Sequence, residues 1–164
     1  EWQTLPDGEE GLMLVKGPNV MQGYLGQPEK TAEVLRDGWY NTGDIACMNA
    51  QGFVFLTGRL SRFSKIAGEM VPHGAVEEAL QTIAETDDPC IAVVGKPDAI
   101  KGEQLAVCYT DAAGDPASLV SNLRKLDLPN LWIPRAANFI RIENLPMLGT
   151  GKLDLCTLNT LANS

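Results

Sequence analysis

A lysine at the end of a glycine-rich turn is the first feature of this sequence that could do chemistry. Residues 145–152 read Leu-Pro-Met-Leu-Gly-Thr-Gly-Lys, so two glycines precede Lys152. Such a turn can bring an ammonium to a phosphate, because glycine allows a close backbone approach. A P-loop would need glycine at 146 and Ser or Thr at 153, where Pro146 and Leu153 stand. On this pattern alone, a surface turn with a solvated lysine is the simpler interpretation.

A second candidate is the carboxylate of Asp44 in the stretch Tyr-Asn-Thr-Gly-Asp at 40–44. A turn that ends in an exposed carboxylate can accept two hydrogen bonds from a vicinal diol, such as that of a ribose. The alternative is an Asx-type turn or a helix cap, because Asn and Asp side chains often bond the backbone two residues further on.

A third candidate is the basic stretch 58–69, which contains Arg59, Arg62 and Lys65 against the single acidic residue Glu69. Three cations on an extended segment could meet an anionic ligand. The alternative is an edge strand whose charges prevent association with other strands.

Overall composition excludes several classes of function. The chain has 164 residues, of which 45% are hydrophobic, and a net charge of −8 from 13 basic and 21 acidic residues. An acidic chain lacks the basic face that nucleic-acid binding requires and the polybasic segment that anchors a protein to anionic lipid. No apolar run reaches the roughly 18 residues that span a bilayer.

The four cysteines form no Cys-x-x-Cys pair, and the single histidine, His73, has no cysteine nearby. A zinc site is therefore not expected, and we assign no metal ligands in this chain. Cys90 and Cys108 lie in apolar runs and are expected to be core residues. Reduced cysteines indicate a cytoplasmic location.

The first part of the chain, residues 1–58, is expected to be rich in strands and turns. A short apolar run predicts a strand at 12–16, and Pro28 begins a short helix over 28–35. Two strands at 45–48 and 53–57 flank a hairpin turn that contains glycine. These elements could hardly close a core alone, so we expect them to be the end of a larger domain.

The second part, residues 59–164, has the pattern of a small α+β domain. Apolar residues recur at helical spacing over 73–84, and Asp115-Pro116 predicts a second helix start. Apolar runs at 91–94 and 105–109 predict strands, and the alternating pattern at 139–142 predicts another. The expected fold is a small three-stranded sheet covered by helices.

Taken together, these motifs resemble those of the adenylate-forming superfamily, which includes acyl-CoA synthetases, luciferases and peptide-synthetase adenylation domains. Residues 40–44 resemble its Y-x-T-G-D, and 58–68 with Glu77 resemble its G-R-x-x-x-x-x-K-x-x-G…E. Residues 146–152 resemble its P-x-x-x-x-G-K, and 17–24 its G-P-x-x-x-x-G-Y.

A closer resemblance comes from residues 63–71, 101–103 and 148–154. These are similar to the acyl-[acyl-carrier-protein] synthetase part of bacterial 2-acylglycerophosphoethanolamine acyltransferases. The resemblance implies an ATP-dependent, fatty-acid-activating ligase. A carboxylate first attacks ATP to give an acyl-adenylate, and a thiol of acyl carrier protein then gives a thioester and AMP. Reacylation of lysophospholipids is the implied role.

The resemblance also implies roles for individual residues in the nucleotide site. Lys152 would be the catalytic lysine of the adenylation step, stabilising charge on the α-phosphate. Asp44 would hold the ribose hydroxyls, with Arg59 assisting, and Leu56 would pack near the nucleotide. ATP/AMP is the implied cofactor, with Mg²⁺ held by ligands of the parent that lie outside this chain.

Three further residues are implied to act in a rotation of the small domain between the two half-reactions. Ser61 falls at the hinge, near residues 60–61, where most family members carry Asp or Lys. Lys65 matches a lysine that approaches the adenylate in the thioester-forming pose. Gly68 lies where the thiol arm passes. Leu148 is a second departure, because the family usually has Thr there.

A serine-, threonine- and glycine-rich phosphate loop and an acyl pocket are both missing. We therefore expect this chain to be inactive alone and to need the rest of its own large domain. The parent is expected in the cytoplasm, or at the inner face of a bacterial cytoplasmic membrane. An acyl-CoA ligase using CoA and a non-catalytic binding module are the alternatives.

Overall fold

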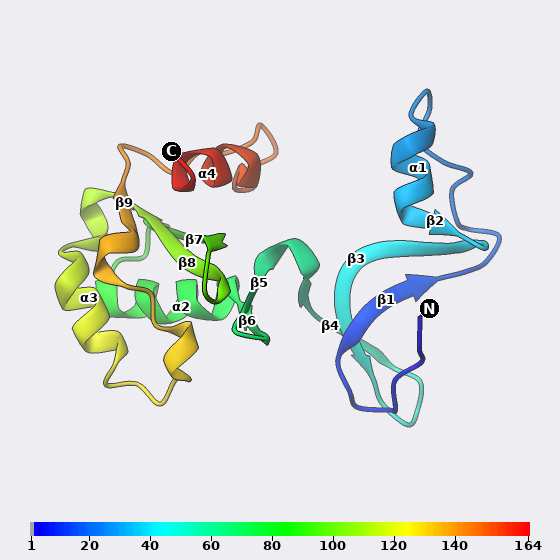
Figure 1. The fold of residues 1–164 in the computed structure, drawn as a ribbon, viewed down its shortest axis with the longest axis horizontal. Coiled ribbons are helices and arrows are strands. Elements are labelled where there is room, and N and C mark those ends of the chain that lie inside the picture. The colour runs from blue at the N-terminus through cyan, green and yellow to red at the C-terminus, as the bar shows by residue number, and fades with distance from the viewer. Residues whose placement is uncertain (1) are drawn as a thin grey trace. The chain divides into compact units, whose positions relative to one another are not determined.

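A computed structural model describes residues 2–164, which divide into two compact units after Ser61 (Figure 1). Unit 1 runs up to Ser61, and unit 2 runs from Arg62 to Ser164. Each is described by itself below. Within residues 2–164, no helix is both long enough and apolar enough to cross a membrane.

Unit 1 is a sheet of four strands with one short helix. Its elements are β1 (Gly11–Val15), α1 (Pro28–Val34), β2 (Leu35–Arg36), β3 (Trp39–Met48) and β4 (Val54–Arg59). The long strand β3 is central: β1 pairs with one of its edges, and β2 and β4 pair with it at different places, all antiparallel.

The β3–β4 hairpin is closed by an asparagine and a glycine, as the sequence predicted. The Asn49 side chain accepts hydrogen bonds from the backbone N–H groups of Gln51 and Phe53. Gly52 adopts a φ of +81°, a left-handed conformation that favours glycine. The predicted helix at Pro28 is also confirmed, with proline in its first turn.

Unit 1 has no hydrophobic core of its own. Every residue from 2 to 61 keeps measurable solvent exposure, and the side chains of β4 are among the most exposed: Phe55 is 52% and Leu56 65% exposed. A cavity of about 840 Å³ lies between the N-terminal segment and the β1–β3 strands, with Trp2, Leu5 and Trp39 in its wall. Within unit 1, residues 2–61 therefore supply no layer that buries these apolar side chains.

Unit 2 contains a five-stranded sheet. Its strands are β5 (Phe63–Ile66), β6 (Glu69–Pro72), β7 (Ile91–Asp98), β8 (Gly102–Tyr109) and β9 (Phe139–Arg141). The order is β6-β5-β8-β7, and β9 runs parallel to β8. The α+β class is confirmed. The expected three strands correspond to β7, β8 and β9, and the β5–β6 hairpin extends the sheet to five.

Helices cover both faces of this sheet. They are α2 (His73–Ala84), α3 (Pro116–Leu123) and α4 (Leu155–Ala162), with short 3-10 turns at 60–62, 111–113, 130–132 and 136–138. In Figure 1, α4 lies on the opposite side of β7 and β8 from α2.

Because helices cover both faces, β7 and β8 are buried on both sides, and alternate residues enter two separate cores. Val93 and Val107 join the core beneath α2 and α3, together with Val76, Leu80 and Leu123. Ala92, Val94, Ala106 and Cys108 face the other way, against Leu158 and Ala162 of α4. This explains the unbroken apolar runs at residues 91–94 of β7 and 105–108 of β8.

The sequence analysis missed α4. The helix has only eight residues, although Leu155, Leu158 and Ala162 recur in it at helical spacing. A usable signal was present, because the Asp154 carboxylate caps the helix by accepting bonds from the backbone N–H groups of Cys156 and Thr157. The Thr157 hydroxyl also donates to this carboxylate at 2.7 Å, and this bond, followed by the backbone bonds, lowers the pKa of Asp154.

His73, the first residue of α2, is 3% exposed and contacts a second buried polar group, Ser64 of β5. Its Nε2 lies 2.9 Å from the Ser64 hydroxyl, and its Nδ1 has no partner within residues 2–164. Burial, with a smaller contribution from Arg62, lowers the pKa of His73 to about 4. The imidazole is therefore neutral at physiological pH.

This burial predicts an acid-sensitive fold. A histidine whose folded-state pKa lies below its unfolded value of 6.5 binds fewer protons when folded, so stability is complete above pH 6.5 and falls toward pH 4. The loss should reach roughly 3 kcal/mol in the free energy of unfolding of unit 2. Urea unfolding from pH 7 to 4 measures it. His73→Gln should flatten the slope between pH 6.5 and 5, and an unchanged slope would contradict the assignment.

Candidate functional site

In unit 1, the structure brings Asp44 and Arg59 together. The Arg59 Nε donates to Asp44 Oδ1 at 2.9 Å, and its NH2 group donates to the Thr42 carbonyl at 3.1 Å. The Asp44 side chain is 28% exposed and the Arg59 side chain 63% exposed. One carboxylate oxygen of Asp44 is thus occupied by the guanidinium, which leaves Oδ2 able to accept hydrogen bonds from a ligand.

One irregularity in the pairing of β3 with β4, a bulge in β4, creates this pair. Ala46 lies opposite Leu56, but Ile45 lies opposite Gly58, so Thr57 is an extra residue in β4. Without this bulge, Asp44 would face Gly58, and Arg59 would be one position out of reach. The bulge therefore sets the register that places the guanidinium opposite the carboxylate.

The segment around Asp44 lies inside β3, rather than in the turn that the sequence indicated. Its Asx-type bonding was foreseen: the Asn41 side chain accepts the Gly43 N–H at 2.9 Å, and Thr42 Oγ1 accepts the Asp44 N–H at 3.0 Å. Gly43 adopts a φ of +74°, and the pairing of β3 with β1 is irregular here. Thr42 Oγ1 also donates to the Met13 carbonyl of β1, which ties the segment to the sheet.

Leu56 lies on the same face of the sheet as Asp44. It pairs with Ala46, which is two residues from Asp44 along β3, and successive side chains alternate between faces. Its side chain is 65% exposed, so it offers an open apolar surface beside the carboxylate.

In unit 2, Lys65 and Gly68 belong to one hairpin. Lys65 is exposed on β5, opposite Met70 of β6, while its neighbours Ser64 and Ile66 point into the core. Ala67 and Gly68 form the turn, with φ angles of +51° and +92°. A Cβ at Gly68 would meet no atom within 4 Å, so within this unit glycine is favoured by the backbone conformation and not by crowding.

Lys152 lies in a tight turn that leads into α4. The Leu148 N–H donates to the Lys152 carbonyl at 2.8 Å, and the Gly151 N–H donates to the Leu148 carbonyl at 2.9 Å. Gly151 has a φ of +77°. The Lys152 side chain is exposed, and in the described part of the chain its ammonium forms no ion pair. These hydrogen bonds fix the backbone of the turn, while the Lys152 ammonium stays available to a ligand.

The basic stretch 58–69 is less available than its sequence implied. Arg62 pairs with Glu77 of α2 and donates to the Val93 carbonyl, and its side chain is only 20% exposed. Arg59 is paired with Asp44. Lys65 is therefore the one cation of the three with no carboxylate partner among residues 2–164. Ser61 lies between Arg59 and Arg62, in the 3-10 turn of residues 60–62.

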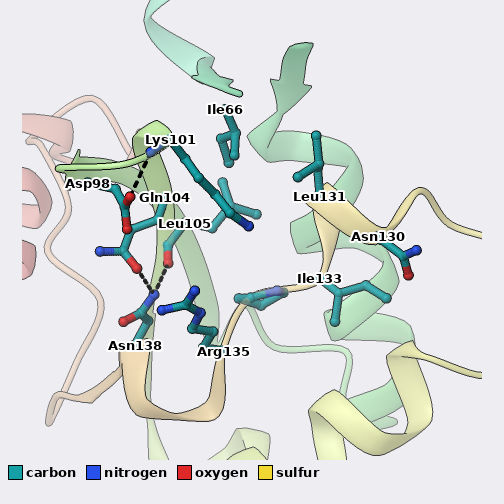
Figure 2. Close-up of a pocket in the computed structure, with 11 residues that line it drawn as sticks. Ile66, Asp98, Lys101, Gln104, Leu105, Asn130, Leu131, Ile133, Arg135 and Asn138 are labelled. Atoms are coloured by element: carbon teal, nitrogen blue, oxygen red, sulfur yellow. Dashed lines mark hydrogen bonds between the residues drawn. The ribbon is translucent and has the colours of Figure 1, made fainter. Parts of the chain in front are cut away.

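A small cavity of about 40 Å³ lies in unit 2 beside Ile66 (Figure 2). Lys101 and Arg135 line it together with Asp98, whose carboxylate accepts the backbone N–H groups of Ile100 and Lys101. These bonds lower the pKa of Asp98. The cavity therefore carries charges of both signs. Asn138, which donates to Gln104 and to the Leu105 carbonyl, forms its buried base.

The predicted residues thus fall into three groups. Asp44, Arg59 and Leu56 lie together on unit 1, Lys65 and Gly68 share a hairpin of unit 2, and Lys152 occupies a separate turn of unit 2. Within residues 2–164, no three side chains of histidine, cysteine, aspartate or glutamate gather as a metal site. Sequence reasoning named Glu77 and Glu103 only as motif residues, and it did not predict their bonds, which join Glu77 to Arg62 and Glu103 to the Lys65 N–H.

No family model matches the chain. Among curated proteins it is 36% identical over 154 residues to a feruloyl-CoA synthase of Amycolatopsis sp, covering 92% of this chain and 30% of that protein. It is also 36% identical over 148 residues to a long-chain-fatty-acid–CoA ligase of Bacillus subtilis (strain 168), covering 88% of this chain and 26% of that protein. The chain thus spans under a third of these relatives.

The solved structures that are similar to this chain belong to the same kind of enzyme as the curated relatives. ATP-bound MatB from Rhodopseudomonas palustris matches with a TM-score of 0.74 and 29% identity, over 95% of this chain and 31% of that one. MenE from Bacillus subtilis, in complex with an acyl-adenylate intermediate, matches with a TM-score of 0.74 and 26% identity, over the same shares. The homologues and structural neighbours of this chain are adenylate-forming acyl- and aryl-CoA ligases, and its fold matches their C-terminal domain.

The turn of Gly68 yields a test that does not depend on activity. Gly68→Ala should lower the stability of unit 2 by roughly 1 kcal/mol, because an L-residue is strained at a φ of +92°. Gly74→Ala is the matched control: Gly74 lies in α2 without a positive φ and has open space around its Cβ position. Alanine there should be neutral or stabilising by about 0.5 kcal/mol. Equal effects of both substitutions on the free energy of unfolding would contradict the account.

Proposed function

We propose that this chain is part of an ATP-dependent ligase that activates a carboxylic acid as an acyl-adenylate and transfers the acyl group to a thiol. One observation carries the proposal. The chain has these relatives, its Lys152 is exposed and forms no ion pair among residues 2–164, and its Asp44–Arg59 pair leaves one carboxylate oxygen open. The domain boundary is proposed at residues 58–59, with a hinge at residues 60–61.

In the proposed first step, Lys152 acts on the α-phosphate. A carboxylate and a phosphate repel each other as they approach, and negative charge builds on the phosphate in the transition state. A positioned ammonium lowers this cost in a way that bulk water cannot, because its orientation is fixed beforehand. The tight turn around Gly151 supports this role, since it fixes the lysine backbone and leaves the side chain free.

Asp44 and Arg59 are proposed to hold the ribose of ATP. A carboxylate can accept hydrogen bonds from both hydroxyls of a vicinal diol, and the guanidinium keeps the Asp44 carboxylate oriented. Leu56, exposed on the same face, would pack against the nucleotide. A solved MenE structure with ATP and magnesium supports these cofactors for the relatives. The Mg²⁺ ligands are proposed to lie outside this chain.

In the proposed second step, Lys65 and Gly68 meet the adenylate and the thiol arm after a rotation at Ser61. The short 3-10 turn of residues 60–62, at the division between the two units, supports a hinge there. Serine replaces the Asp or Lys that is usual in the family, so the hinge would work through its backbone torsions.

The acceptor is proposed to be the thiol of acyl carrier protein, with lysophospholipid reacylation as the role and a membrane-associated parent. The similarity of residues 63–71 and 148–154 to acyl-[acyl-carrier-protein] synthetases supports this. CoA is the second candidate, and it is favoured by the printed names of the relatives. The engagement of Arg59 and Arg62 by carboxylates also weakens the basic surface that an acidic carrier protein would use.

Replacing the proposed adenylation lysine in the full-length enzyme tests the proposal. Lys152→Ala should slow adenylation by about 100-fold or more, because a key transition-state charge is lost. Thioester formation from supplied acyl-adenylate should survive, and assays with CoA and with acyl carrier protein in parallel decide the acceptor. Lys125→Ala is the control, since that exposed lysine bonds only Asn122. Equal loss of both half-reactions, or of neither, would refute the role.

A substitution at the proposed hinge tests the rotation. Ser61→Pro fixes φ near −65° and restricts the preceding residue, so the backbone loses the torsional freedom that a rotation needs. Adenylation should persist while thioester formation collapses. Ser61→Ala, which keeps this freedom, should support both steps. Single-turnover rates for each half-reaction give the answer, and normal thioester formation in Ser61→Pro would place the hinge elsewhere.

A further inference from the structure

The strand that carries Lys65 is joined to the sheet by few backbone contacts. β5 pairs with β6 along its full length, but it meets β8 through one registered pair, Ile66 opposite Gly102, next to the bond from the Ala67 N–H to the Lys101 carbonyl. A strand held this weakly can slip, and a slip of one residue turns every side chain to the other face. The register of the β5–β6 hairpin against β8 therefore depends largely on contacts other than ladder bonds.

Side chains supply the missing bonds. The Lys65 N–H donates to Glu103 Oε2 of β8 at 2.5 Å, so a carboxylate takes the place of a ladder carbonyl. The Ser64 hydroxyl lies 2.9 Å from His73 Nε2 at the start of α2. Arg62 bonds Glu77 and the Val93 carbonyl, while Glu77 Oε1 accepts the Val93 N–H at 2.6 Å. Three of the first four residues of unit 2 are thus held by α2, β7 or β8.

The fit around Ser64 excludes the slipped register. Ser64 is fully buried, and its hydroxyl occupies the space where a side chain at Gly95 would begin. Glycine at 95 is therefore required by close approach. If β5 slipped by one residue, the larger side chain of Phe63 or Lys65 would have to enter this closed space in place of Ser64, at a steric cost. The Ser64–His73 bond over Gly95 consequently keeps Lys65 on the exposed face.

We propose that Glu103 and the Ser64–His73 pair are positioning residues that hold Lys65 in place for the thioester-forming step. This inference rests on the proposed function of Lys65. Glu103 does not touch the reacting groups in this account; it acts through the Lys65 backbone. A strand held at these points moves with unit 2 as one body, so Lys65 keeps its place relative to β8.

The structural half of the proposal is tested on the 164-residue chain by amide hydrogen exchange. Glu103→Ala should speed exchange of the Lys65 amide by about tenfold or more, because a hydrogen bond to a charged group is lost. Exchange of the core amides of β7 should stay unchanged. Glu103→Gln, whose amide oxygen can still accept the bond, should retain part of the protection. Glu69→Ala, on the neighbouring strand, is the matched control and should leave Lys65 unaffected.

The functional half is tested in the full-length enzyme with the same variants. Glu103→Ala and Ser64→Ala should lower the rate of thioester formation from acyl-adenylate by about tenfold, while adenylation stays within about twofold. Glu103→Gln should rescue part of the loss. A variant that destabilises the whole unit would lower both rates together, which overturns a positioning role.

Together, the exchange experiment and the rate measurements distinguish a failure of this inference from a failure of the proposed function. If Lys65→Ala leaves thioester formation unchanged, the proposed role of Lys65 is wrong. If Lys65→Ala abolishes that step but Glu103→Ala and Ser64→Ala leave it intact, the positioning inference alone is overturned. Unchanged exchange of the Lys65 amide in Glu103→Ala also overturns it.

Discussion

Repulsion between two anions is the constraint on which the account depends. A carboxylate and a nucleotide phosphate must approach to bonding distance, and in the proposed reaction a single ammonium, that of Lys152, offsets their charges. The chain itself is acidic, so a free cation must be kept away from neighbouring carboxylates. The turn of residues 148–152 does this, since its backbone bonds hold the segment while the side chain remains unpaired.

The two units differ in how much apolar surface they bury, and this difference determines how firmly each one supports its charged residues. Unit 2 encloses β7 and β8 between helices on both faces, so its strands form a stiff support for Lys65 and Lys152. Unit 1 has no buried residue within 2–61, and its apolar side chains remain exposed. Since the chain covers under a third of its relatives, the proposed nucleotide site on unit 1 would be completed by the rest of the protein.

Sequence periodicity predicted the elements in which burial is one-sided or continuous. The helix at 73–84 was predictable because Val76 and Leu80 recur on one face, and both are fully buried. Strands β7 and β8 were predictable from their apolar runs. The helix α4 was not predicted, although Leu155, Leu158 and Ala162 recur at helical spacing and pack into the second core. Its presence on this face explains why Ala92 and Val94 of β7 are apolar.

The sequence predicted which residues form the candidate site, but it did not predict the contacts between them. Motif spacing pointed to Asp44 and Arg59, yet their ion pair depends on the bulge at Thr57, which no local pattern signals. The basic stretch suggested three free cations, and long-range partners, Glu77 among them, remove two. The burial of His73 was also unexpected, because its partner Ser64 is nine residues away and lies in a strand. Such pairings are set by tertiary packing.

Chemical rescue of a Lys152→Ala enzyme by small amines tests the central claim most directly. ATP–pyrophosphate exchange in the full-length variant should recover with added ethylammonium, because a free cation can occupy the position that the side chain has left. Ethanol, which is similar in size and uncharged, should not restore it. Equal recovery with both compounds, or exchange that is undiminished before any amine is added, would contradict the claim that this ammonium neutralises the reacting phosphate.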